Sequence, residues 1–123
     1  MRFIEEVVVD EFLPTVRSML AEDLRDRGFT QSEVADALGI SQSAVSKYAA
    51  GDVARHEAIV ADERVRDLVE RVGEGFASGD HTPVGALVEI EVLIRQLEEG
   101  DLLADLHEDA MPALAEADVE FSV

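Results

Sequence analysis

The sequence predicts an all-α fold, a helical N-terminal domain followed by a further helical segment. Apolar residues recur at intervals of three and four over most of the chain, the spacing of amphipathic helices. Glycine and proline separate these periodic stretches, as expected where helices begin or end. The chain has 123 residues and is 47% hydrophobic, so it can bury a core of its own.

The first helix is expected to begin near Leu13 and Pro14, because proline fits the first turn, where its missing N–H is not needed. Gly28 is expected to end this helix. Its periodic apolar positions are Val16, Met19, Leu20 and Leu24. Before it, residues 7–9 are three consecutive valines, which we interpret as a short strand or an extended arm packed on the domain.

Two short helices follow. Residues 30–33 read Thr-Gln-Ser-Glu, a capping box in which the Thr hydroxyl and the Glu carboxylate satisfy free backbone N–H groups. Gly39 is expected to end the helix that starts there. Ser41 can cap the next helix, which should run to about Ala50, with Gly51 closing it.

A fourth helix is expected over residues 62–72. Residues 73–83 are rich in Gly, Ser and Asp and predict a linker or long loop. The next helix should be capped by Thr82, have Pro83 at its first position and run to about Glu99. A short helix over residues 101–108 is expected after it, and the pattern of the last residues is ambiguous.

A helix-turn-helix is predicted in the stretch QSEVADALGISQSAVSKY. This motif needs a small residue where the two helices cross, here Ala35, and a residue able to take a positive φ in the turn, here Gly39. Ile40 fills the turn, and Val45 and Tyr48 anchor the second helix on the core. The alternative is two amphipathic helices of a bundle joined by a glycine turn.

The second helix of this pair has a polar face without acids. With Ala49 expected to point inward, the outward residues are Gln42, Ser43, Ser46, Lys47 and Ala50. A Gln can bind adenine with two hydrogen bonds, Ser can donate or accept, and Lys can reach guanine or phosphate. The N-terminal residues of a recognition helix usually meet the bases, so Gln42, Ser43 and Ser46 are the expected base contacts. Lys47 is expected to contact a base or a phosphate.

The stretch resembles the helix-turn-helix of XRE (Cro/C1-type) regulators, which have a lambda-repressor-like fold. Residues 7–51 are similar to archaeal XRE-type regulators and to the segment that precedes a thiamine-phosphate-synthase-like domain in some archaeal proteins. The resemblance implies an all-helical DNA-binding domain and dimers on two-fold DNA sites. The chain stops before any synthase-like domain and has no cysteine. Synthase activity, thiamine sensing and a thiolate metal site are therefore not carried over.

Four further residues are candidate phosphate contacts, namely Gln31, Arg17, Arg55 and His56. Arg55 and His56 follow the predicted recognition helix in a short loop, where the chain should run near the DNA backbone. For these two residues a solvated loop is an equal alternative. Arg17 lies on the first predicted helix, from which its side chain could contact a DNA phosphate.

No catalytic site, cofactor site or metal site is predicted. His56, His81 and His107 are far apart and have no cysteine partners. A weak cation site at residues 107–109, His-Glu-Asp, is less favoured than a solvated helix end. No nucleophile–base pair or phosphate-cradling loop stands out, so we do not expect an enzyme.

A dimerisation seam is one interpretation of the helix that follows Pro83, and packing within the subunit is the other. The seam would comprise Leu87, Ile90, Ile94 and Leu97, spaced as in a short coiled coil.

The charge is strongly acidic, with 28 acids against 10 bases and a formal net charge of −18. The only lysine is Lys47, and residues 72–123 hold thirteen acids and one base. Such a balance indicates adaptation to high salt, where charge repulsion is screened, and the alternative is an ordinary acidic protein. The N-terminus carries acids where a signal peptide needs an apolar run, and no 18-residue apolar stretch occurs, so we expect a cytoplasmic protein.

These observations predict a sequence-specific DNA-binding transcription regulator that acts as a homodimer, with any small-molecule effector unknown. The expected parts are a DNA-binding domain over residues 1–72, a linker over 73–83 and an acidic helical dimerisation or accessory segment over 84–123. The alternatives are a helical interaction module of antitoxin type and a regulatory fragment whose sensor lies on another chain.

Overall fold

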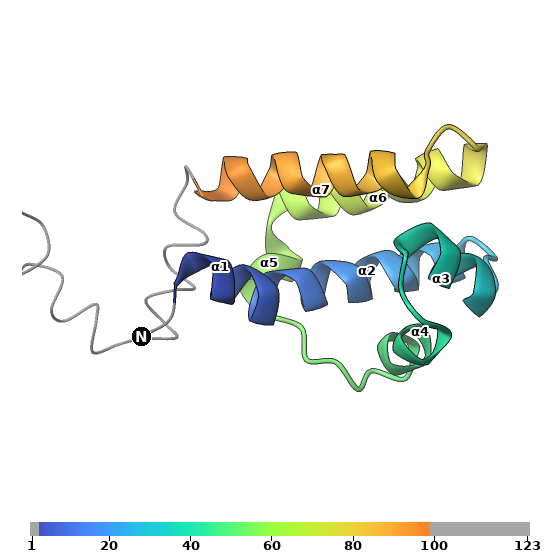
Figure 1. Ribbon diagram of the computed structural model, residues 1–123, viewed down its shortest axis with the longest axis horizontal. Coiled ribbons are helices and arrows are strands. Elements are labelled where there is room, and N and C mark those ends of the chain that lie inside the picture. Colours follow the sequence, from blue (N-terminus) through green and yellow to red (C-terminus); the bar gives the residue numbers. More distant parts are fainter. Residues whose placement is uncertain (1–2, 99–123) are drawn as a thin grey trace, which may run out of the picture.

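The computed structural model describes residues 3–98, and every regular element in that range is a helix (Figure 1). This confirms the predicted all-α class. In chain order the elements are α1 (Ile4–Val7), the π-helix η1 (Val8–Phe12), α2 (Leu13–Asp26), α3 (Gln31–Leu38), α4 (Gln42–Ala49), α5 (Glu57–Ala61), α6 (Glu63–Ser78) and α7 (Pro83–Glu98).

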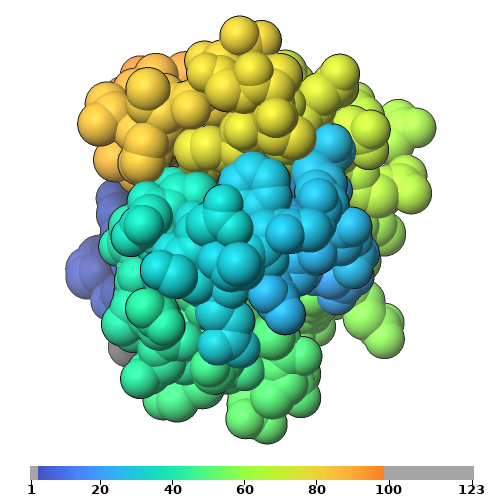
Figure 2. All heavy atoms as spheres, turned by 90° about the vertical axis from the view of Figure 1, so that its right-hand side faces the viewer, coloured from blue at the N-terminus to red at the C-terminus, as the bar shows by residue number. Residues whose placement is uncertain are grey.

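Helix α2 lies at the centre of the molecule. The hairpin of α6 and α7 runs along one side of it, and α4 lies on the other side (Figure 1). Figure 2 shows the end of the bundle, where α3 occupies the middle of the face between the hairpin above and α4 below. The α3–α4 pair and the hairpin are thus held together mainly through α2.

Two hydrophobic clusters share α2. The first joins its N-terminal half to α1, η1, α5, α6 and α7, and includes the fully buried Phe12, Leu20 and Leu97. The second joins its C-terminal half to α3 and α4, and includes the fully buried Leu24 and Val45. Helix α7 therefore packs in the same core as α2 and α6.

The expected strand or arm at residues 7–9 is wrong, because these valines are helical. Val7 and Phe12 are fully buried while Val9 and Asp10 between them are exposed, so the apolar spacing is that of a helix. Helix α2 also has no free start at Leu13, since it continues from η1. Pro14 cannot donate to the carbonyl four residues back, and the wider π-turn before it, closed by Leu13 N–H to the Val8 carbonyl, accommodates that gap.

The expected linker is wrong over residues 73–78, which continue α6. Its glycines serve packing and do not break the helix. A Cβ on Gly73 would overlap a carboxylate oxygen of Asp23, and one on Gly75 would lie 2.6 Å from Cγ of His81. The helix ends at Gly79, which has a φ of 81°. Only residues 79–82 separate α6 from α7.

Helix α5 has no clear signal in the sequence. This short helix is capped by His56, whose Nδ1 accepts from the Ala58 N–H. Asp62 ends α5 and starts α6, accepting from the N–H groups of Arg64 and Val65. The start of α7 is as predicted, with Thr82 Oγ1 accepting from the Gly85 N–H at 3.1 Å.

Several expectations lie outside the described residues. These are the end of the last long helix near Glu99, the short helix over residues 101–108 and the weak cation site at residues 107–109.

Candidate nucleic-acid interface

The turn between α3 and α4 has the predicted geometry. Thr30 Oγ1 accepts from the Glu33 N–H at 3.1 Å, and the Glu33 carboxylate accepts from the Thr30 N–H at 3.0 Å, which completes the capping box. Gly39 has a φ of 64°, a left-handed conformation that glycine adopts without strain. The Ile40 N–H then donates to the Ala35 carbonyl at 3.0 Å, so the chain turns sharply into α4.

Helix α4 is fixed on the core by one face. Ser41 Oγ caps it by accepting from the Ala44 N–H at 3.1 Å. Val45 is fully buried and Tyr48 is half-buried against the same cluster. Ala49 is exposed, contrary to expectation, because it lies beyond the edge of the face that contacts α2 and α3.

The opposite face of α4 is open. Gln42, Ser43, Ser46 and Lys47 are all exposed, as predicted. Ser46 Oγ lies 3.5 Å from Oε1 of Gln31, which connects the middle of α4 to the start of α3. The Lys47 ammonium makes no hydrogen bond or ion pair with the described residues, so it is available to a ligand.

The start of α3 carries charges of both signs. The hydrogen bonds from Thr30 lower the pKa of Glu33, so its carboxylate stays ionised two residues from Gln31. Arg25 lies beside the start of α3 and donates from Nη1 to the Phe29 carbonyl at 2.9 Å. Sequence reasoning missed Arg25, because only the folded loop brings the end of α2 to the start of α3.

This geometry is that of two short helices at a tight turn, with the second exposed along one side. Residues 20–55 match the helix-turn-helix family. The match covers α3, α4 and the part of α2 that packs against them, so the chain has a helix-turn-helix domain near its N-terminus. This family is characteristic of DNA-binding regulators. No curated protein and no solved structure matches the chain.

Two of the expected phosphate contacts, Arg55 and His56, instead make hydrogen bonds to α2 within the protein. Arg55 donates from Nε to Ser18 Oγ at 2.8 Å, and from Nη2 to the Ser18 carbonyl at 3.2 Å and the Glu22 carboxylate at 2.7 Å. His56 donates its backbone N–H to Thr15 Oγ1 at 3.0 Å. The loop after α4 is thereby fastened to α2, whereas the sequence favoured a solvated or phosphate-binding loop.

Arg17 lies away from α4. Its half-buried side chain lines a pocket between α2, α3 and α7, and α7 lies on the opposite side of α2 from α4 (Figure 1). A phosphate contact by Arg17 stays a prediction that the position of the pocket does not favour.

The expected dimerisation seam divides between the core and the surface. Leu97 is fully buried in the subunit, and Ile90 and Ile94 are half-buried against the same core. Leu87 is 55% exposed. A different row of apolar side chains on α7 faces outward, formed by Val84, Val88 and Val92.

The described residues hold no group of three or more His, Asp or Glu side chains arranged to bind a metal ion. Within residues 3–98, none of the helices combines the length and apolar character needed to cross a membrane.

Proposed function

We propose that this protein is a sequence-specific DNA-binding transcription regulator that acts as a homodimer in a high-salt cytoplasm, with α4 in the major groove. The observation that carries the proposal is the exposed face of α4, which has no acid and holds the unpaired Lys47 in a chain of net charge −18. A relation to the archaeal XRE-type regulators is part of the proposal.

The base contacts fall on Gln42, Ser43 and Ser46, near the start of the recognition helix. A bidentate contact such as Gln to adenine discriminates against a wrong base by about 1–3 kcal/mol. Lys47 contacts a base or a phosphate. Gln31 sits at the start of α3, next to Ser46, where a phosphate contact would fix the orientation of the domain. We add Arg25, which lies beside the start of α3, as a phosphate contact.

The acidity of the whole chain does not prevent this binding. Two like charges 10 Å apart in water repel by roughly 0.4 kcal/mol before screening. In 1 M salt the Debye length is about 3 Å, so acids away from the contact face have little effect on the DNA. The specific contacts therefore outweigh the remaining repulsion as long as the α4 surface itself is free of acids.

The dimer contact falls on the exposed row Val84, Val88 and Val92, with Leu87 beside it. A two-fold dimer of this kind would place two recognition helices about 34 Å apart, one turn of DNA. Val88→Asp introduces a charge at the centre of the row and is expected to give a folded monomer in analytical ultracentrifugation. A Val88→Asp variant that remains dimeric would place the dimer contact elsewhere.

The decisive experiment is selection from random double-stranded DNA in 2 M KCl. We expect enrichment of a two-fold site, and loss of that enrichment in the double variant Gln42→Ala, Lys47→Ala. The matched control is Gln96→Ala, Arg66→Ala, which removes one amide and one unpaired cation from exposed positions on α7 and α6. The control should select the same site as the wild-type protein.

Absence of enrichment with a folded wild-type protein would reject DNA reading. It would favour the other candidate, a helical interaction module that retains the fold. The exposed Glu33 and Asp36 beside α4 would then suit a basic protein partner.

A further inference from the structure

We propose that the pocket between α2, α3 and α7 binds an organic anion with a short apolar body. The pocket has a volume of about 70 Å³. Nine of the ten residues that line it are apolar, and the tenth is Arg17. This combination of one cation and an apolar wall suits a ligand with a carboxylate at one end and a hydrocarbon at the other.

The state of Arg17 distinguishes this pocket from an ordinary packing defect. Arg17 and Arg55 are both half-buried. Arg55 is held by Ser18 and Glu22, whereas the guanidinium of Arg17 has no hydrogen bond or ion pair with any described residue. Partial burial without a partner is unfavourable for a charge, and a bound anion would supply the missing partner.

The surroundings also favour an anion. Acids outnumber bases 28 to 10 in the chain, yet none lines this pocket. A ligand carboxylate at Arg17 therefore meets a cation, with no carboxylate among the other lining residues. A cationic ligand would be repelled at the same position.

The size of the pocket limits the ligand. A closed cavity of about 150 Å³ holds benzene, so a pocket of half that volume accepts the end of an alkyl chain and not a large ring system. Leu87, which is 55% exposed, lies on the same wall and can cover the part of the chain that extends outward. A carboxylate of about four to eight carbons fits these limits.

The pocket lies directly behind the DNA-binding motif. Ala37 and Leu38 line it and immediately precede the turn residue Gly39. Leu38 also packs against both hydrophobic clusters. A ligand here would contact the first helix of the motif, but its binding does not depend on the protein binding DNA.

The test is a titration of the full-length protein with hexanoate in 1 M KCl, followed by NMR of the methyl groups. We expect shifts at Ala37, Ala86 and Leu87, and saturable binding. Across acetate, butyrate and hexanoate each methylene that enters the pocket should tighten binding about fourfold. Hexanol and hexylammonium carry the same chain without the negative charge and should bind at least about tenfold more weakly.

Two pairs of variants assign the site. Arg17→Gln should weaken hexanoate binding about tenfold or more, while Arg95→Gln, at an exposed unpaired arginine of α7, should not. Leu87→Asp places a carboxylate on the pocket wall and should also weaken binding, while Gln96→Asp, at an exposed position of α7 that does not line the pocket, should not. Three outcomes would overturn the proposal. Hexanol or hexylammonium could bind as tightly as hexanoate, or a folded Arg17→Gln variant could bind hexanoate as tightly as the wild-type protein. The NMR shifts could also be confined to surfaces away from the pocket.

Discussion

Arg55 is a residue whose role in the fold is not visible from its neighbours in the chain. Its guanidinium joins the loop after α4 to Ser18 and Glu22 of α2, more than thirty residues earlier. Ser18 is 2% exposed, so removal of Arg55 would leave its hydroxyl buried without the present donor. The contacts explain why the loop lies on α2.

Arg55→Gln is therefore expected to lower the free energy of unfolding by about 1–3 kcal/mol, the cost of losing hydrogen bonds that involve a charged group. Denaturant unfolding in 2 M KCl measures this loss of stability. The control is Arg66→Gln, because the Arg66 side chain is exposed and unpaired. DNA affinity, measured where each variant is fully folded, should be unchanged. A stable Arg55→Gln variant with weakened DNA binding would instead support the phosphate contact that the sequence suggested.

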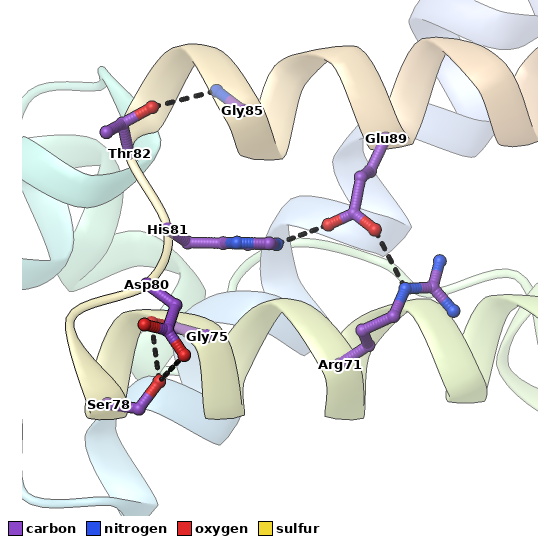
Figure 3. A network of polar contacts seen from close by, with 8 residues as sticks. All are labelled: Arg71, Gly75, Ser78, Asp80, His81, Thr82, Gly85 and Glu89. Atoms are coloured by element: carbon purple, nitrogen blue, oxygen red, sulfur yellow. Dashed lines mark hydrogen bonds and ion pairs between the residues drawn. The ribbon is translucent and has the colours of Figure 1, made fainter.

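Position 75 requires glycine because the imidazole ring of His81 packs closely against it. His81 lies over it in the α6–α7 loop, with Cγ only 2.6 Å from where a Cβ would lie, and contacts the Glu89 carboxylate (Figure 3). The rings of His81 and Phe76 also form a T-shaped contact. An added methyl group cannot be accommodated by moving the far end of a flexible chain, because Cγ is close to the backbone.

Gly75→Ala should accordingly lower the free energy of unfolding by about 1–3 kcal/mol, in spite of the better helix propensity of alanine. Gly85→Ala is the matched control, since its added Cβ would lie no closer than 3.4 Å to Thr82 Oγ1, and it should be neutral or stabilising by up to ~1 kcal/mol. Thermal and denaturant unfolding of both variants measure the difference. Equal stability of Gly75→Ala and the wild-type protein would contradict this packing role.

At the scale of elements, a polar bridge fastens α7 to α6. The Glu89 carboxylate of α7 accepts from Arg71 Nε of α6 at 2.8 Å and contacts Nε2 of His81 in the connecting loop (Figure 3). Burial by itself would raise the pKa of Glu89, but the hydrogen bonds from Arg71 and His81 outweigh it, so its pKa is lowered.

A lowered pKa in the folded state means that the ionised Glu89 stabilises the fold above its unfolded pKa, about 4.3, and that this contribution is lost as the pH falls through the folded value. The difference in unfolding free energy between the wild-type protein and Glu89→Gln should therefore shrink as the pH falls below about 4.3. Denaturant unfolding from about pH 3 to 7 in 2 M KCl measures it. Glu91→Gln, at an exposed acid of the same helix, controls for general charge removal, and a Glu89 difference that is flat over the whole range would reject the bridge.

The same elements show what sequence reasoning can reach. The helix-turn-helix was predictable because its signals are local: a capping box at Thr30, a positive φ at Gly39 and a helical apolar rhythm up to Tyr48. The exposed face of α4 followed from that rhythm. The length of α6 did not, because Gly73 and Gly75 resemble helix breakers in the sequence and are explained only by side chains from α2 and the following loop. The contacts of the loop after α4 with α2 are equally non-local.

At the scale of the whole molecule, the distribution of charge governs how DNA binding responds to salt. Several arginines are already bonded to carboxylates within the protein, namely Arg27, Arg55, Arg64 and Arg71. Few cations near α4 are left to neutralise phosphates. We therefore expect counterion release from DNA, which drives nonspecific binding by basic repressors, to contribute little to DNA binding by this protein.

The proposed DNA contacts predict the size of this effect. Lys47 and Arg25 in each protomer would neutralise about four phosphates per dimer, which corresponds to a slope of log K against log salt no steeper than about −4. A repressor with about eight phosphate contacts would have a slope near −7. Fluorescence anisotropy with the selected DNA site between 0.5 and 2 M KCl measures the slope.

Individual variants then test which cations contribute. Lys47→Gln should make the slope shallower by about 0.9 for each phosphate that is no longer neutralised, or about 2 for the dimer, and Arg25→Gln should do the same. Arg95→Gln on α7 should leave the slope unchanged, because α7 and α4 lie on opposite sides of α2 (Figure 1). A wild-type slope near −7 would mean that cations other than these two meet the DNA, and the proposed orientation of the domain would then be wrong.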